Sequence, residues 1–388
     1  MRLRSLRRPL AVGALILAAV LAVALWLRPD SYVAHPDTTD LPRARPDLAT
    51  TALKDWLAER AAADANSALD ITDLSARVVA QNGAMHEDGT WTAKAALTWA
   101  YGEVDPSPAS AEVTVRLRTT GDGVVVTGLS QPGRVPVWAA GPVTVTRTPS
   151  TLVVTGEGVD HQAYVRWAST AVKVVRRVVT DWDGPLVLEV PATSAQLDDV
   201  LGATAGTYAN VAAITAAVDG STRADAPVHV LVNRDVMATL DARSSQIVIS
   251  HEATHAATGA VLTTARPLWL SEGFADYVAL RDVDVPLRTS AGQIAKLVRN
   301  DGVPTALPHA ADFDSSSPTF GAEYEAAWQV CVQLVDDAGE RALVRLYDEV
   351  GTGTALATAL HREVGYGVAT LTSRWQHRLE SLPGAGGQ

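Results

Sequence analysis

The stretch "HEATHAATGAVLTTARPLWLSEGFADYVA", from His251 to Ala279, carries the pattern that decides the fold of this chain. Its first five residues place two of the chain's nine histidines four positions apart, with a glutamate directly after the first. Side chains four apart on a helix face the same way and lie about 6 Å apart, so His251 and His255 can bind one ion. Glu252 would then lie beside that ion. The pattern predicts two metal ligands and a general base for metal-assisted hydrolysis.

The second half of the stretch supplies a third ligand, which catalytic zinc needs in addition to an open coordination position. Glu272 lies in "WLSEGFADY", at the start of a second predicted helix that follows a loop containing Pro267. The loop allows this helix to return antiparallel to the first. We therefore predict one Zn²⁺ per chain, held by His251, His255 and Glu272. Asp276, one turn beyond Glu272, is predicted to accept the free N–H of a ligand histidine.

Metal-assisted hydrolysis of a carbonyl group also needs a donor for the oxyanion that develops on the carbonyl oxygen. The candidates follow the motif in the helical region: Tyr324 in "FGAEYEAAWQ" and His309 in "LPHAADF". Tyr324 is our first choice and His309 the second. The alternative is that Tyr324 is only a packing aromatic. The predicted catalytic residues are therefore Glu252 and Tyr324.

The H-E-x-x-H segment followed by a W-L-x-E-G-F-A-x-Y helix resembles the gluzincin metallopeptidases, the group that includes thermolysin and aminopeptidase N. The similarity is greatest to the peptidase MA-like bacterial proteins. It runs over roughly residues 228–379 and is strongest at 251–255 and 268–277. The resemblance implies a thermolysin-like catalytic domain with a mixed sheet and zinc-binding helices. It also implies an edge strand that holds the substrate backbone, for which "VAAITAAV" (211–218) is the candidate.

One departure from the family pattern bears on the substrate. Aminopeptidase N-type enzymes carry a G-A-M-E-N segment shortly before the zinc helix, and its glutamate binds the free amine of the substrate. The similar string here, "NGAMHED" (82–88), lies far from His251 in the chain and is interpreted as a loop of the first module. An endopeptidase is therefore favoured over an aminopeptidase. The alternative function is a non-catalytic surface protein that uses a metallopeptidase-like fold to bind a partner.

The start of the chain predicts a membrane anchor. The basic stretch "MRLRSLRR" precedes 19 apolar residues, Pro9–Leu27, and at 1.5 Å per residue these span about 28 Å, close to the hydrocarbon thickness. Basic residues favour the cytoplasmic side, so the N-terminus should lie in the cytoplasm and the catalytic domain outside. The alternative is a signal peptide cleaved after an A-x-A site at Ala22–Ala24, giving a secreted protein.

Composition and patterning complete the expected organisation. The net charge of −11 repels polyanions, so a peptide or protein is expected as substrate and nucleic acid is not expected as a partner. A helix and antiparallel strands over 47–156 predict a small α+β module, which could be of the nuclear-transport-factor-2 type. We expect an α+β protein with an anchor at 1–28, a linker at 29–46, this module, and a metallopeptidase domain at 157–381. That domain is expected to contain a strand at "PVHVLVN" (227–233) and an α-helical C-terminal part, and 382–388 form a disordered tail. Apolar periodicity predicts the helices of that part at 270–281, 289–299, 319–337, 340–349, 353–362 and 367–380.

Overall fold

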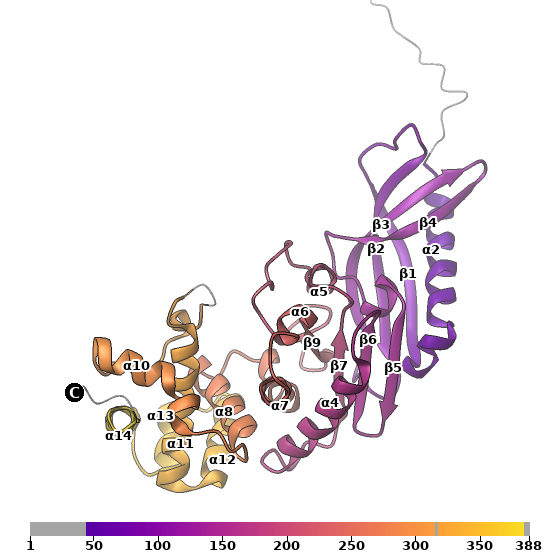
Figure 1. The fold of residues 1–388 in the computed structure, drawn as a ribbon. Coiled ribbons are helices and arrows are strands. Elements are labelled where there is room, and N and C mark those ends of the chain that lie inside the picture. Colours follow the sequence, from indigo (N-terminus) through magenta and orange to yellow (C-terminus); the bar gives the residue numbers. More distant parts are fainter. Residues whose placement is uncertain (1–43, 315–316, 384–388) are drawn as a thin grey trace, which may run out of the picture. The chain divides into compact units, whose positions relative to one another are not determined.

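The computed structural model describes residues 44–314 and 317–383 of the chain. Antiparallel and mixed sheets lie in its first half and a helical region follows (Figure 1). The predicted α+β class is therefore confirmed for the described residues.

The first half opens with helix α2 (Pro46–Ala61), which packs against a four-stranded antiparallel sheet of order β1-β2-β3-β4. The strands are β1 (Ile71–Asn82), β2 (Thr90–Tyr101), β3 (Ala109–Thr120) and β4 (Gly123–Ser130). Ala49, Leu53 and Leu57 recur at helical spacing on α2 and are fully buried against the sheet. The helix begins at Pro46, because proline lacks the N–H that the first helical turn leaves unbonded anyway.

Strand β1 was not predicted, and its burial pattern explains why. It lies at the edge of the sheet, and of its 12 residues Ala76 alone is fully buried. Its register with β2 also shifts between Thr72 and Ser75 and again between Val78 and Ala80. An exposed edge strand with such irregularities lacks the regular alternation by which strands are recognised.

A second sheet has five strands in the order β5-β6-β7-β9-β8. These are β5 (Val143–Thr148), β6 (Thr151–Gly156), β7 (Leu186–Val190), β8 (Ala213–Ala217) and β9 (Val228–Val232). The β5–β6 hairpin pairs through β6 with β7 in parallel, so it belongs to this sheet and not to the first. The division between the sheets therefore falls before Val143, whereas the sequence places a module boundary after residue 156.

The second sheet is buried on both faces. Val187 and Leu231 pack into a core shared with the first sheet, whereas Leu188 and Val230 pack against helices α4 (His161–Arg176) and α7 (Ala242–Thr258). Burial on both faces explains the near-continuous apolar runs of these strands. Three short helices lie in the connections, α3 (Val137–Ala140), α5 (Ser194–Leu201) and α6 (Arg234–Met237).

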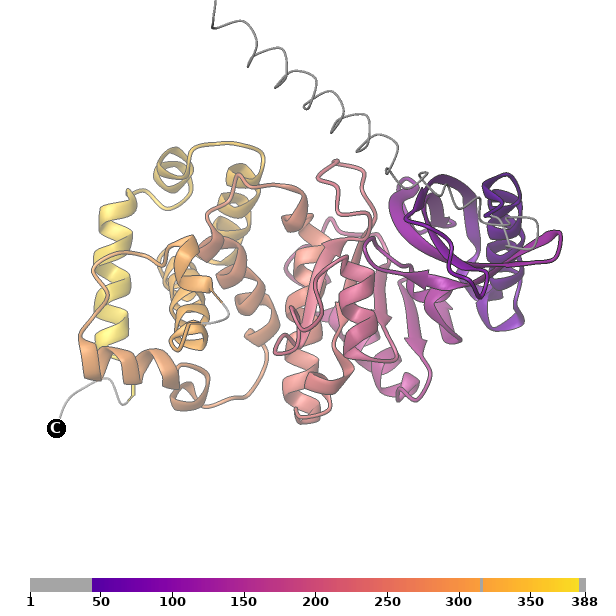
Figure 2. The ribbon, with the colours of Figure 1, turned by 90° about the horizontal axis from the view of Figure 1, so that it is seen from above.

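The remaining helices gather in one group, coloured orange to yellow in Figure 2. They are α8 (Leu268–Leu280), α9 (Leu287–Ser290), α10 (Gly292–Asp301), α11 (Phe320–Ala338), α12 (Glu340–Gly351), α13 (Leu356–Glu363) and α14 (Val368–Glu380). Their boundaries lie within a few residues of those predicted from apolar periodicity. The α-helical C-terminal part is therefore confirmed.

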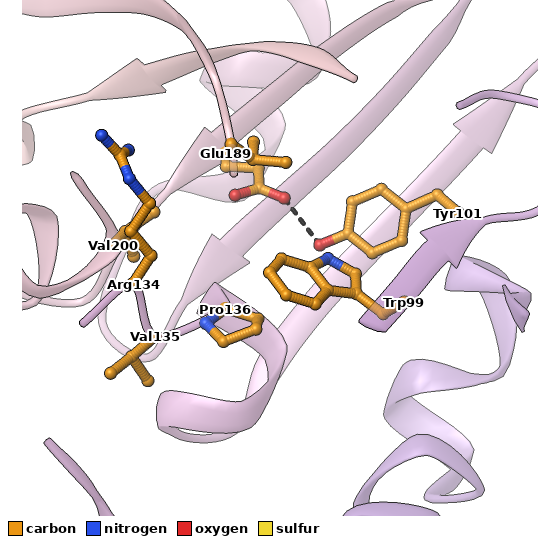
Figure 3. A pocket seen from close by; sticks show the side chains of 8 residues that line it. Trp99, Tyr101, Arg134, Val135, Pro136, Glu189 and Val200 are labelled. Atoms are coloured by element: carbon orange, nitrogen blue, oxygen red, sulfur yellow. Dashed lines mark hydrogen bonds between the residues drawn. The ribbon is translucent and has the colours of Figure 1, made fainter. Parts of the chain in front are cut away.

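Between the two sheets lies a buried polar cluster that we call the sheet cluster: Tyr101, Asp105, Glu189 and His229. The Tyr101 hydroxyl donates to Glu189 Oε1 at 2.6 Å, the contact drawn in Figure 3. His229 Nε2 lies 2.9 Å from Asp105 Oδ1, and its Nδ1 lies 3.3 Å from Glu189 Oε1. Burial lowers the pKa of His229, but the two carboxylates raise it more, to about 10. The ring is therefore an imidazolium that joins the sheets.

The predicted location in the membrane must be corrected. Within residues 44–314 and 317–383, none of the helices combines the length and the apolar character needed to cross a bilayer. The predicted anchor at 1–28 lies outside the described residues, as do most of the linker and residues 384–388 of the tail. A single-pass cell-membrane location is therefore not supported by the structure.

Candidate metal centre

Helix α7 carries both histidines of the H-E-x-x-H segment. Asp241 caps its start, where its carboxylate accepts from Ser244 N at 2.7 Å, and the helix ends at Gly259 with a φ of 57°. The residues between these two caps form one continuous helix, so the helical period decides which of its side chains share a face. His251 and His255 lie one turn apart on it, with ring centroids 4.7 Å apart.

Three potential ligand atoms converge at one point. His251 Nε2 and His255 Nε2 are 3.0 Å apart, and Glu272 Oε2 lies 3.2 Å from the first and 3.3 Å from the second. Three ligands at the usual zinc distances in a tetrahedral arrangement would be about 3.3 Å from one another. The donor set, two imidazoles and one carboxylate, also suits zinc. The residues therefore fit the predicted ion.

Glu272 reaches this point because α8 returns beside α7 after Pro267, which caps α8. Burial raises the pKa of Glu272, but His255 and His251 lower it by a larger amount. The pKa of Glu272 therefore lies well below the usual value. The carboxylate is therefore ionised and faces two ring nitrogens. A cation bound at this point would take the place of protons on the imidazoles.

Asp276 lies one turn after Glu272, and its Oδ1 is 2.8 Å from His251 Nδ1. With Nδ1 as the donor in this contact, the Nε2 of the neutral ring keeps its lone pair for a metal. Burial lowers the pKa of His251, but Asp276 and Glu272 raise it well above the usual value. Asp276 thus sets the orientation of this ring, and an ion bound at Nε2 would replace the proton that the raised pKa holds on the ring.

Glu252 lines the same cleft, and it is not one of the three residues whose ligand atoms converge. The hydroxyl of Thr215, on strand β8, lies 2.7 Å from Glu252 Oε2 and 2.9 Å from the backbone oxygen of the same residue. Sequence reasoning missed Thr215, because the link joins residues 37 apart on two different elements.

The cleft has a volume of about 390 Å³ and runs from β8 to α11. Its lining consists of Val211, Ala213, Ile214, Thr215, His251, Glu252, His255, Ala260, Val261, Leu268, Ser271, Glu272, Phe313, Phe320 and Tyr324. Strand β8, within the predicted "VAAITAAV" segment, is an edge strand of the second sheet. Its edge position is thereby confirmed.

Tyr324 reaches the cleft because α11 packs closely on α8. A Cβ added at Gly273 would lie 2.3 Å from Ala327 O and 3.0 Å from Cys331 Sγ, so only glycine allows this approach. The Tyr324 ring lies 6.1 Å from that of His251. Burial first, then the charges of nearby carboxylates, keep the pKa of Tyr324 far above the usual value. Its hydroxyl is therefore a protonated donor beside the site.

His309 and the "NGAMHED" string both lie outside the cleft lining. His309 is exposed and caps the short 3₁₀ helix η3 (Ala310–Phe313). The structure therefore places Tyr324 at the cleft and His309 at a helix start. The "NGAMHED" string forms the turn between β1 and β2 in the first sheet, as the loop interpretation predicts.

Comparison with known proteins identifies no family. No family model matches the chain, and no curated protein matches it. Among solved structures, a mutant M1 zinc metallopeptidase from Deinococcus radiodurans with bound Tyr-Ser-Ala substrate is 16% identical, with a TM-score of 0.38; 77% of this chain and 64% of that one are covered. A two-domain M1 zinc metallopeptidase mutant with bound L-arginine is 13% identical, with a TM-score of 0.36 and coverages of 80% and 62%. The chain thus spans less than two thirds of either structure. Likeness at this level assigns neither family nor activity.

Proposed function

We propose that this chain is a zinc-dependent metallopeptidase. The observation that carries the proposal is the convergence of two imidazole nitrogens and one carboxylate oxygen, all within 3.3 Å of one another, in a cleft that Glu252 also lines. A zinc ion bound there by His251, His255 and Glu272 would lower the pKa of a water ligand and polarise a carbonyl group.

The side chains around that position provide the proton transfers. Glu252 accepts a proton from the attacking water and passes it to the amine that leaves. Tyr324 donates a hydrogen bond to the carbonyl oxygen as negative charge develops on it. Asp276 holds the His251 ring in the orientation in which Nε2 faces the site.

The substrate is proposed to be a peptide that adds to the open edge of β8. Among the described residues, the carboxylates that line the cleft are Glu252 and Glu272, and both already have a role. An aminopeptidase would need a further carboxylate for the free amine. An internal peptide bond is therefore the proposed target, which makes the proposed enzyme an endopeptidase. The type of catalytic domain proposed for it is thermolysin-like.

The first experiment combines metal analysis with a peptide-library digest of the purified chain and its Glu252→Gln variant. We expect about one zinc per chain in both proteins. Turnover should fall by about 10²–10⁴-fold in the variant, because the base is lost while the ligands remain. Peptides blocked at the N-terminus should be cleaved as well as free ones.

Two results would contradict the proposal. Unchanged turnover in Glu252→Gln would assign the activity to another group or a contaminant. A zinc-loaded protein that binds peptides without cleaving any would support the alternative of a non-catalytic binding protein.

A further inference from the structure

Thr215 connects two parts of the site that the proposed function treats separately: the strand that would hold the peptide and the glutamate that would move the proton. Its side chain is buried, with 5% of its surface exposed, on the edge strand β8. The hydroxyl lies 2.7 Å from Glu252 Oε2. The hydroxyl therefore donates a hydrogen bond to one oxygen of the carboxylate.

The backbone of Thr215 faces the open edge of the sheet. In the antiparallel pairing of β8 with β9, Asn233 N donates to Ala212 O and Val218 N donates to Pro227 O. Hydrogen-bonded positions alternate along such a pair, so residues 212, 214, 216 and 218 bond to β9. The peptide groups of 213, 215 and 217 therefore point away from β9. A peptide added to this edge would bond to the residue whose hydroxyl holds Glu252.

We propose that Thr215 is a positioning residue that orients the Glu252 carboxylate for proton transfer and links this orientation to peptide docking on β8. The inference rests on the proposed peptidase function. A carboxylate on a flexible side chain has several rotamers, and a hydrogen bond to one oxygen selects among them. The hydroxyl also lies 2.9 Å from Glu252 O, and since it has one proton, the two oxygens of Glu252 share this donor on β8.

The test compares Thr215→Val, which keeps the shape and removes the hydroxyl, with Thr215→Ser, which keeps the hydroxyl. Hydrogen bonds to charged groups are worth enough for kcat to fall by about 10- to 100-fold in Thr215→Val, with KM changed much less. Thr215→Ser should recover most of that loss. Zinc content should stay near one per chain in both variants.

Thr155→Val is the matched control. Thr155 is also buried in the same sheet, and its hydroxyl lies 2.8 Å from His161 Nδ1, on helix α4. This substitution also removes a buried hydroxyl, so it should lower Tm while leaving kcat unchanged. Equal losses of kcat in Thr155→Val and Thr215→Val would reduce the role of Thr215 to general stability.

A second measurement does not depend on activity. In metal-free protein, Thr215→Val should lower Tm less in a Glu252→Ala background than in the unmodified chain, because the two side chains are coupled. Additive effects on Tm, or normal kcat in Thr215→Val, would overturn the inference while leaving the peptidase proposal standing. A zinc-loaded chain that cleaves no peptide would instead overturn the proposed function, and the positioning role with it.

Discussion

Two buried clusters in this chain are built from the same residue types. The sheet cluster places His229 between Glu189 and Asp105 with Tyr101 beside them. The cleft cluster, defined as His251, His255, Glu272, Asp276 and Tyr324, again combines imidazole, glutamate, aspartate and tyrosine. In the sheet cluster both ring nitrogens of the histidine face carboxylates. In the cleft cluster one nitrogen of His251 faces Asp276, and the other faces the second imidazole and Glu272.

This difference decides what each cluster can bind. His229 lies between two carboxylates with no second imidazole beside it, so its ring is held as a protonated cation that has no lone pair for a metal. At His251 a second imidazole and the Glu272 carboxylate meet the same ring nitrogen, so these three groups together can bind an ion that replaces the proton on that nitrogen. Access differs as well: the sheet cluster borders a void of about 10 Å³, room for one water, whereas the cleft measures about 390 Å³. Composition alone therefore does not distinguish a metal site from a structural ion pair.

The largest expected effect separates the two glutamates. Glu272→Ala removes one of three ligands and should weaken zinc binding by roughly 10³-fold. The free energy of zinc binding to a full set of protein ligands is about 10–16 kcal/mol, and each ligand contributes a large share of it. Glu189→Gln should leave zinc binding unchanged and cost stability instead. Zinc content after dialysis against a mild chelator measures both. Full occupancy in Glu272→Ala would remove Glu272 from the ligand set.

The two tyrosines give the next comparison. Tyr324→Phe keeps the ring and removes the hydroxyl, so turnover should fall by about 10²–10³-fold with zinc unchanged. Tyr101→Phe removes the hydroxyl that donates to Glu189 and should lower Tm without lowering turnover. Peptide hydrolysis and thermal unfolding of both variants test this. Normal turnover in Tyr324→Phe would reduce Tyr324 to a packing role.

A smaller effect is expected at the two aspartates. Asp276→Asn weakens the support of His251 Nδ1 and should lower zinc affinity by about 10–100-fold. Asp105→Asn leaves His229 with one carboxylate and should cost about 3–5 kcal/mol of stability, because it breaks a buried ion pair. Chelator competition and denaturant unfolding measure the two quantities. If Asp105→Asn lowered zinc affinity as much as Asp276→Asn does, the sheet cluster would affect metal binding and the comparison of the two clusters would fail.

The smallest effect is a pH dependence that belongs to the sheet cluster. The pKa of His229 is raised to about 10 in the folded chain, compared with about 6.5 when unfolded. The folded state therefore binds the extra proton, and its contribution to stability is complete below pH 6.5 and is lost as pH rises toward 10. The slope is at most about 1.4 kcal/mol per pH unit. His229→Gln should flatten this slope in urea unfolding at pH 7–9, and an unchanged slope would assign it elsewhere.

Much of the helical region could be predicted from the sequence. The predicted helix 319–337 is observed as Phe320–Ala338, because apolar residues at helical spacing and Gly339 specify it locally. The helical period alone predicts that the two histidines of the H-E-x-x-H segment lie on one face of a helix. Local rules also predicted β8 and β9, whose short apolar runs are flanked by loops.

Features that depend on long-range pairing could not be predicted. Strand β1 has little apolar alternation, so only its pairing with β2 defines it. The β5–β6 hairpin was assigned to the first module, because nothing in its own residues indicates that β6 pairs with β7. The sheet cluster joins Tyr101 to Glu189, 88 positions further along the chain, and sequence spacing carries no information about such a contact.

For the candidate site, the sequence by itself determined which groups could act: two histidines, a glutamate between them and the "WLSEGFADY" helix. Residues in one helix have a fixed relative direction, so the local period suffices. Only the tertiary structure decided that Glu272 meets both imidazoles, that Tyr324 and not His309 lines the cleft, and that Thr215 contacts Glu252. These contacts depend on how helices and strands pack, which is decided by burial across the whole core.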